Sequence, residues 1–174
     1  ANSHFPNNEL GFYFNLCDIQ GNCKIAFRNY KKQITEELGS NINLLNTTNT
    51  QPHIAIHNEQ KVMYFVSDRK GGFGGMDIWL SIISKGGNYG VPINAGDKIN
   101  SAFDEITPFF NSFEEVLYFS SNRTNGLGGF DIYTSKGKLN LWDQPINAIQ
   151  FNTKQDEMYL SFYKETKGYF SSNR

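Results

Sequence analysis

The chain has 174 residues and a formal net charge of −1, and 39% of its residues are hydrophobic and 15% aromatic. It contains no basic run, so neither nucleic acid nor an anionic membrane surface is expected as a partner. It also lacks the apolar stretch of about 18 residues that a membrane-spanning helix needs. The length suits one sizeable domain, and 16 glycines combined with many aromatic residues are typical of packed sheets joined by tight turns.

The two cysteines lie on either side of a predicted turn near the N-terminus. Cys17 and Cys23 flank the sequence Asp-Ile-Gln-Gly-Asn and stand on the two arms of a predicted strand pair. Cysteines opposed across strands can reach disulfide distance. We expect a disulfide formed in an oxidising compartment, and the alternative is two buried small side chains. A metal site is not expected, because no further Cys or His pair completes a ligand set.

Residues 29–38 are the one segment whose apolar spacing would permit a short helical turn. The corresponding positions later in the chain are interrupted by Pro92 and Pro145, so a helix is not favoured. Elsewhere the apolar residues form short runs bounded by turn residues, which indicates strands. The expected fold class is therefore all-β.

In the segment His53–His57, histidines and isoleucines alternate, which places both histidines on one face of a strand. Zinc would need further ligands, and none lies nearby in the sequence, so we expect a solvated strand face. Strands are expected near 62–67 and 76–82. Between them, Gly71–Gly75 has the composition of a phosphate-binding loop. It lacks the final Lys-Ser/Thr and opens no helix, so we interpret it as a turn.

A second group of strands follows in the C-terminal half. Strands are expected near 106–110, 116–121, 130–135 and 158–163. Pro108 places the first of them at a sheet edge or a strand start, because proline has no N–H to donate. The segment 141–147 is expected to be a fourth strand of its sheet or a crossing connection.

These strands belong to a unit that is repeated along the chain. The phrase Val62–Arg69 returns as Val116–Arg123 and as Gly168–Arg174, with serines at steps of 121 − 67 = 54 and 172 − 121 = 51 residues. A fainter copy spans residues 12–43. A period in this range indicates an array of similar structural units with atypical terminal copies. Three to four short antiparallel strands in about 50 residues are typical of a β-propeller blade.

We therefore predict an all-β fold of β-propeller blades of about 50 residues, of which the chain covers three to four. The expected units are a partial blade over 1–38, repeats over about 39–92 and 93–145, and a truncated repeat over 146–174. Propellers typically have about four to eight blades. We accordingly expect the chain to be part of a larger propeller.

The phrase Leu117–Arg123, followed by Gly128–Tyr133, resembles the TolB-type, WD-repeat-like propeller unit, and the lead-in from Ile99 to Pro108 is similar to it as well. The double Gly-Gly turn resembles repeats in outer-membrane-associated proteins of Bacteroidetes. In those proteins such propellers are often joined to helical repeats and an OmpA-like peptidoglycan-binding domain, and some belong to the gliding and type IX secretion machinery. The resemblance implies a periplasmic or cell-surface location at the outer membrane and other envelope proteins as partners. It also implies peptidoglycan contact through a domain outside this segment.

Arginine and aspartate recur in the repeat at a constant spacing. Arg69 precedes Asp77 by 77 − 69 = 8 residues, and Arg123 precedes Asp131 by 131 − 123 = 8 residues. A substrate or ion site is one interpretation. A structural salt bridge or turn clamp is favoured, because catalytic sites are rarely copied in every repeat. Each arginine is expected to contact the aspartate arm or an acidic pair.

Two acidic pairs also recur, Asp104-Glu105 and Asp156-Glu157, at a step of 156 − 104 = 52 residues. Paired carboxylates could act as general acid and base or bind Ca²⁺. Because the pairs are repeated with the rest of the unit, a structural role is favoured here too. No metal and no cofactor is expected.

The sequence contains no complete catalytic signature, and a Gly-x-Ser-x-Gly elbow is absent. We therefore expect a non-catalytic protein-interaction scaffold of a bacterial cell-envelope assembly, and not an enzyme. The alternative is a propeller hydrolase, or a regulatory propeller of an enzyme, that acts on glycans or peptides. A charged residue that does not recur and that lines a central funnel would favour this alternative.

Overall fold

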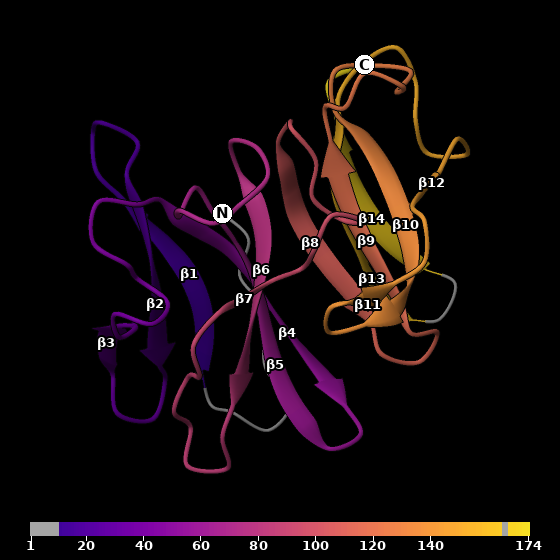
Figure 1. Ribbon diagram of the computed structural model, residues 1–174. Coiled ribbons are helices and arrows are strands. Elements are labelled where there is room, and N and C mark those ends of the chain that lie inside the picture. Colours follow the sequence, from indigo (N-terminus) through magenta and orange to yellow (C-terminus); the bar gives the residue numbers. More distant parts are fainter. Residues whose placement is uncertain (1–10, 165–166) are drawn as a thin grey trace.

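The computed structural model describes residues 11–164 and 167–174, and in them the chain forms fourteen strands and no helix. Four antiparallel sheets follow one another along the chain and stand side by side (Figure 1). The all-β expectation is therefore confirmed. Residues 1–10 of the partial blade predicted for 1–38 lie outside the described residues. The described part of the chain contains no helix long and apolar enough to cross a membrane.

The first sheet has three strands and the second has four, each in sequential order. These strands are β1 (Gly11–Cys17), β2 (Cys23–Asn29), β3 (Ile34–Glu37), β4 (Asn49–His57), β5 (Gln60–Ser67), β6 (Asp77–Ile83) and β7 (Ile93–Asn94). Residues 29–38, where the spacing would have permitted a helical turn, instead form a tight turn and β3.

The third sheet has the order β11-β10-β9-β8, with β12 also paired to β10, and the fourth is the pair β13-β14. These strands are β8 (Glu105–Asn111), β9 (Val116–Ser121), β10 (Asp131–Lys138), β11 (Leu141–Trp142), β12 (Ile146–Asn147), β13 (Glu157–Lys164) and β14 (Lys167–Ser172). A strand occurs at each of the six places predicted. The segment 141–147 contributes two short strands that pair with β10 one after the other.

The hydrophobic core lies between successive sheets. One cluster fills the space between the first and second sheets, a larger one the space between the second and third, and a small one the space between the third and fourth. Strand β5 supplies two of these clusters, because Met63 and Phe65 point to one side while Val62, Tyr64 and Val66 point to the other. A strand covered on both faces needs a continuous apolar run, which is what β5 has.

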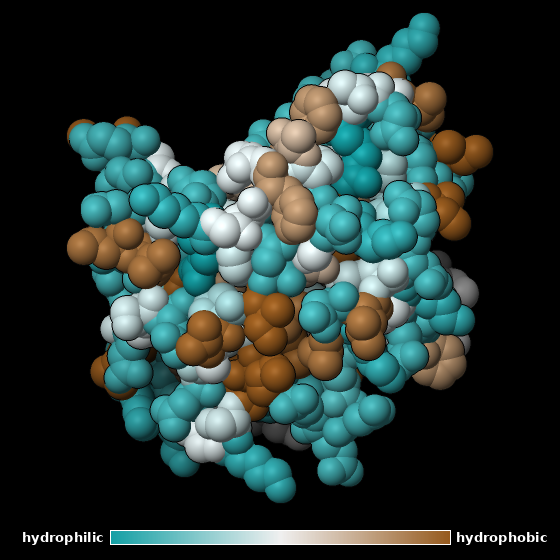
Figure 2. Space-filling view, in the orientation of Figure 1, coloured by the Kyte–Doolittle hydropathy of each residue, from teal (hydrophilic) through white to brown (hydrophobic). Residues whose placement is uncertain are grey.

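The outer strands are more exposed than the strands inside each sheet. Ile93 in β7 is 42% exposed and Ile146 in β12 is 69% exposed, and both occupy the same place in the repeat. Figure 2 shows hydrophobic residues gathered near the centre of this face, around the position that β7 has in Figure 1.

The first strands of the second, third and fourth sheets have a bulge at the same place. Gln51, Thr107 and Tyr159 have φ angles of 53°, 54° and 59°, and the strand register shifts beside each of them. The bulges also connect neighbouring sheets. The Gln51 N–H donates to Asn15 Oδ1 at 3.0 Å, and the Thr107 N–H donates to Gln51 Oε1 at 2.7 Å. The bulges at Gln51 and Thr107 therefore each expose a backbone N–H that a side chain of the preceding sheet satisfies.

The first strands of successive sheets lie next to one another, since β4 contacts β8 and β8 contacts β13. Sheets that meet along their first strands and spread apart toward their outer strands are arranged as propeller blades are. Within residues 11–164 and 167–174, the sheets do not close into a ring.

The prediction that His53 and His57 lie on a solvated face is wrong. They are only 6% and 8% exposed, because β8 of the third sheet packs over this face of β4. The His53 ring lies 4.7 Å from the Phe109 ring, and the His57 ring lies 4.3 Å from the Phe110 ring. Sequence alternation identified the shared face but could not indicate that another sheet covers it.

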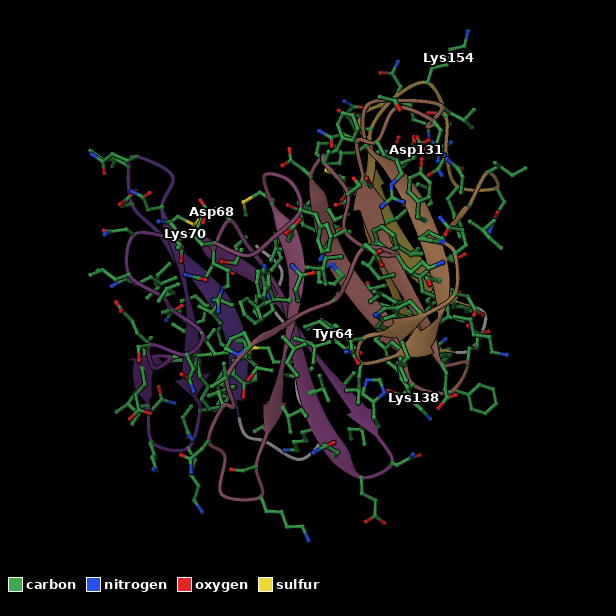
Figure 3. All side chains as sticks on the ribbon, viewed as in Figure 1. Tyr64, Asp68, Lys70, Asp131, Lys138 and Lys154 are labelled. Carbon is green, nitrogen blue, oxygen red and sulfur yellow. A yellow bond between two sulfur atoms is a disulfide. The ribbon has the colours of Figure 1, made fainter. Side chains whose placement is uncertain are left out.

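His57 lies at the boundary between the second and third sheets, in surroundings that disfavour its protonation. Tyr64 Oη lies 3.0 Å from His57 Nε2, and Figure 3 shows Tyr64 and Lys138 at this boundary. Burial lowers the pKa of His57, and the charge of Lys138 lowers it further, while Glu115 acts in the opposite direction. A proton on this ring would place a charge among aromatic side chains.

We expect the protein to lose stability as the pH falls through the ordinary histidine pKa of 6.5. The folded-state pKa of His57 lies below that value, so the unfolded chain takes up a proton first, and stability is complete above it and declines below it. Urea unfolding followed at several pH values should show this decline. In the variant His57→Gln the decline should be shallower, and an equally steep decline would contradict the assignment to His57.

The structure contains a disulfide between Cys17 and Cys23, which face each other at the end of the β1-β2 pair with Cα atoms 4.0 Å apart. Asp18 organises the turn between them, because its carboxylate accepts the N–H groups of Gln20 and Asn22 at 2.9 Å each. The disulfide therefore closes a turn that is already hydrogen-bonded.

Replacing both cysteines by serine should lower the free energy of unfolding by about 2 kcal/mol, the chain-entropy value for a loop this short. Reductant should have the same effect on the wild-type protein and none on the double variant. Equal stability of the oxidised wild type and the double variant would contradict this prediction.

Candidate functional site

The recurring arginines lie between aromatic rings, where Arg69 is buried and the Arg123 side chain is 14% exposed. The guanidinium carbon of Arg69 lies 4.8 Å from the centre of the Phe65 ring and 5.4 Å from that of Trp79. Arg123 lies 5.3 Å from Phe119 and 4.7 Å from Tyr133 in the same way. In both cases one ring comes from the second strand of the sheet and the other from the third. Each arginine thus links the second strand of its sheet, which precedes the arginine, to the third strand, which begins at the recurring aspartate.

Each guanidinium also holds the loop that enters from the preceding segment. Arg69 donates to the carbonyl oxygens of Asn41 at 3.0 Å and Ile42 at 2.6 Å, and Arg123 donates to that of Ile99 at 2.7 Å. Arg123 also pairs with Glu105 at 3.2 Å, whereas Arg69 donates to the neutral side chain of Asn49 at 2.7 Å. Burial lowers the pKa of Arg69 to about 10, which leaves it charged at neutral pH.

The recurring aspartates clamp the glycine-rich turns and make no salt bridge to the arginines. Asp77 accepts the N–H groups of Phe73 at 2.6 Å and Gly74 at 3.3 Å. Asp131, which Figure 3 places at the upper end of β10, accepts those of Leu127 and Gly128. Burial raises the pKa of Asp77, and the two turn N–H groups offset part of that effect. Of the two structural interpretations, the turn clamp describes the aspartates.

The first member of each acidic pair connects two sheets. Asp104 accepts the N–H of Met76 at 2.8 Å, and Asp156 accepts that of Phe130 at 2.9 Å. Met76 and Phe130 each precede the third strand of the preceding sheet. Each of these carboxylates therefore fixes the start of its own sheet to the glycine-rich turn of the one before.

The second member of each pair is buried inside its own sheet. Glu105 accepts hydrogen bonds from Ser101 and from Ser121, each at 2.6 Å, in addition to Arg123. Glu157 accepts from Thr153 at 2.7 Å and from Ser172 at 2.8 Å. Burial opposes ionisation of Glu157, but these hydrogen bonds and Arg174 outweigh it and lower its pKa. Both carboxylates are thus occupied by protein donors.

The carboxylates that recur are therefore used to hold the framework, and their acceptor positions are taken by N–H and O–H groups. In the described residues, no group of three or more His, Cys, Asp or Glu side chains could hold a metal ion.

A recurring asparagine, which sequence reasoning did not identify, has a structural role. Asn100 accepts the N–H of Ile78 at 2.8 Å and donates to its carbonyl at 2.9 Å, and Asn152 does the same to Ile132 at 2.8 Å each. Asn43 likewise accepts the N–H of Ile25 and donates to its carbonyl, at 2.8 Å each. The shared contact identifies β2 as the counterpart of β6 and β10. Its signal was the recurrence of Ile-Asn or Phe-Asn upstream of the acidic pair.

The variant Arg123→Ala should lower the free energy of unfolding by roughly 3–5 kcal/mol, because Glu105 would remain buried without its cation. The matched control is Lys24→Ala, which breaks the exposed Lys24–Glu37 pair at 2.9 Å and should change stability by at most about 1 kcal/mol. Urea unfolding measures both. Equal losses in the two variants would contradict a buried structural role for Arg123.

A groove lies between the first and second sheets, at the side of the outer strands. It has a volume of about 560 Å³ and is bordered by β2, β3, the segment 38–41 and the loop 87–89 that follows β6. In Figure 1 this loop lies at the bottom, beside the lower ends of β2 and β3. The loop is closed by hydrogen bonds between Ser84 and Asn88. The volume falls within the range of small-molecule sites, about 300–1,000 Å³.

One wall of the groove is a row of side chains across the first sheet. Tyr13 is opposite Phe27 in the β1-β2 pair, and Phe27 is opposite Glu36 in the β2-β3 pair, so the three side chains share one face. The Tyr13 and Phe27 rings lie 4.8 Å apart. Across the groove, the Tyr89 hydroxyl donates to that of Tyr13 at 2.9 Å, and Asn41 Nδ2 donates to the Tyr89 carbonyl at 2.8 Å.

Sequence reasoning did not identify this groove. Glu36 and Tyr89 are not part of the repeated phrase, and Asn41 lies between them in the chain, so no spacing brings them together. The available signal was that Glu36 and Glu37 have no acidic counterpart in the later copies, where prolines occur.

Comparison with known proteins shows a similarity of fold. No protein-family model matches the chain, and no curated protein matches it. A solved structure, "Crystal structure of a thermostable family-43 glycoside hydrolase", is similar with a TM-score of 0.57 and 16% sequence identity over 90% of this chain. The chain spans 59% of that structure's length. That enzyme is a β-propeller, so the likeness agrees with the blade arrangement of the sheets.

This finding corrects the expectation that the chain is not an enzyme. The similar structure is that of a glycoside hydrolase, which contradicts the expectation. The expectation rested on the recurring polar residues, which have structural roles, and not on the polar residues that occur once. They form the framework, and residues outside the repeat were given too little weight.

Proposed function

We propose that this chain forms blades of a propeller hydrolase that acts on glycans. The observation that carries the proposal is the likeness of 90% of the chain to a family-43 glycoside hydrolase. The groove adds support, since it combines aromatic rings, amides and a carboxylate that is not part of the repeat.

Hydrolysis of a glycosidic bond uses two carboxyl groups, one as general acid and the other as nucleophile or general base. Asp77, Glu105 and Glu157 and their counterparts are unsuitable, because their oxygens accept hydrogen bonds from the framework. The catalytic carboxylates are therefore to be sought among acidic residues that do not recur. Glu36 is one of these, and within the described residues its carboxylate makes no hydrogen bond.

The Cys17–Cys23 disulfide supports placing the protein in an oxidising compartment, such as the periplasm or the cell surface. Envelope proteins as partners, and peptidoglycan contact through another domain, remain predictions from the repeat resemblance. A location outside the cytosol would give a glycan hydrolase access to extracellular polysaccharides.

The purified protein that contains this chain should release reducing ends from at least one polysaccharide or aryl glycoside in a broad panel. Heat-denatured protein is the control for spontaneous hydrolysis. Release of peptides from a protein substrate, with no release from any glycan, would favour the peptide-acting alternative. Absence of turnover across both panels would contradict the proposal.

A further inference from the structure

We propose that the groove between β2-β3 and the loop 87–89 binds an uncharged oligosaccharide. This inference rests on the proposed function for the choice of a sugar as the ligand. The place of binding and the preference for uncharged sugars are argued from the groove itself. The inference assigns a ligand and a selectivity to a surface whose carboxylate, Glu36, does not recur in the later copies of the repeat.

The apolar part of the groove suits the face of a sugar ring. The side chains of Phe27, Leu38 and Tyr89 are partly exposed there. A pyranose ring has C–H groups on its faces and hydroxyls around its edge, so it can stack on an aromatic ring while its edge forms hydrogen bonds. The groove therefore offers the flat apolar surface that a sugar can cover.

The polar part of the groove suits hydroxyl groups. Asn41 Nδ2 is occupied by the Tyr89 carbonyl at 2.8 Å, which leaves its Oδ1 as an acceptor facing no described donor. The Glu36 carboxylate and the Asn88 side-chain amide likewise make no hydrogen bond within the described residues, and all three residues border the groove. Sugar hydroxyls both donate and accept hydrogen bonds, so they can bind the oxygen acceptors of Asn41 and Glu36 and also the amide group of Asn88.

The charge of the groove determines which sugars it takes. Glu36 and Glu37 border it, and among its described lining residues there is no lysine, arginine or histidine. The nearby Lys24 is paired with Glu37 at 2.9 Å. Uronic acids and phosphorylated or sulfated sugars would be repelled, because their charges would meet a carboxylate without a cation. Uncharged oligosaccharides meet no such repulsion.

The framework fixes the groove before any ligand arrives. Arg69 holds the carbonyls of Asn41 and Ile42, and Asn43 holds both backbone groups of Ile25 in β2. Asn41 in turn holds Tyr89. A site whose walls are already ordered loses less conformational entropy on binding.

The test is a ¹H–¹⁵N NMR titration of the chain with uncharged oligosaccharides, and separately with uronic-acid oligosaccharides of the same length. Uncharged sugars should shift the amides of residues 38–41 and 87–89, and uronic acids should shift them much less. In Glu36→Ala the dissociation constant should rise about tenfold, as expected for loss of a hydrogen bond to a charged group. The control Asp143→Ala removes an exposed carboxylate of the third sheet and should leave it unchanged.

Charge reversal gives a second readout. Glu36→Lys should bind uronic-acid oligosaccharides more tightly than the wild type does, because the repulsion becomes an attraction. Glu36 is exposed, so its variants should retain the dispersed spectrum of the folded protein, which the same experiment records.

The outcomes separate this inference from the proposed function. Glycan hydrolysis without shifts in the groove, or with shifts confined to other residues, would overturn the groove assignment alone. Stronger binding of uronic acids than of uncharged sugars by the wild type would also overturn it. Absence of both binding and hydrolysis would overturn both proposals.

Discussion

The structure depends on a guanidinium group held between two aromatic rings in the second and third sheets, which is buried for Arg69 and mostly buried for Arg123. Arg123 contacts Phe119 on the second strand and Tyr133 on the third, and it also holds the Ile99 carbonyl in the loop before its sheet. Because a buried cation must have its hydrogen bonds satisfied, the two strands and the incoming loop have to meet at this point. A single residue thus contacts both strands and the incoming loop.

The copies differ in the acceptor that they offer to this arginine. Glu105 supplies a carboxylate in the third sheet, whereas Asn49 supplies an amide oxygen in the second. At the start of each sheet the carboxylate and the amide are exchanged the other way round. In the second sheet the Asp68 carboxylate accepts the Thr48 N–H, and in the third sheet the Asn122 amide oxygen accepts the Asp104 N–H. The framework therefore needs an acceptor of the right length at these places more than it needs a charge.

This use of polar residues decides where chemistry can occur. A carboxylate that accepts two or three hydrogen bonds from its own framework is poorly placed to receive a proton from a substrate or to attack it. Reactive or binding groups must then come from residues outside the repeat. The groove follows this rule, because Glu36 and Tyr89 do not recur while Arg69, which holds the groove wall, does.

The sequence by itself determined the all-β class, the places of six strands and the glycine-rich turns, and it placed Cys17 and Cys23 on opposite arms of a strand pair. These features depend on local alternation, turn chemistry and a repeat period, all of which can be read along the chain. Only the tertiary structure decided that His53 and His57 are buried, that each aspartate clamps a turn, and that Glu36 and Tyr89 line one groove. Burial and side-chain contact depend on which sheet packs over which face, and that is set by residues as far apart in the chain as Tyr13 and Tyr89.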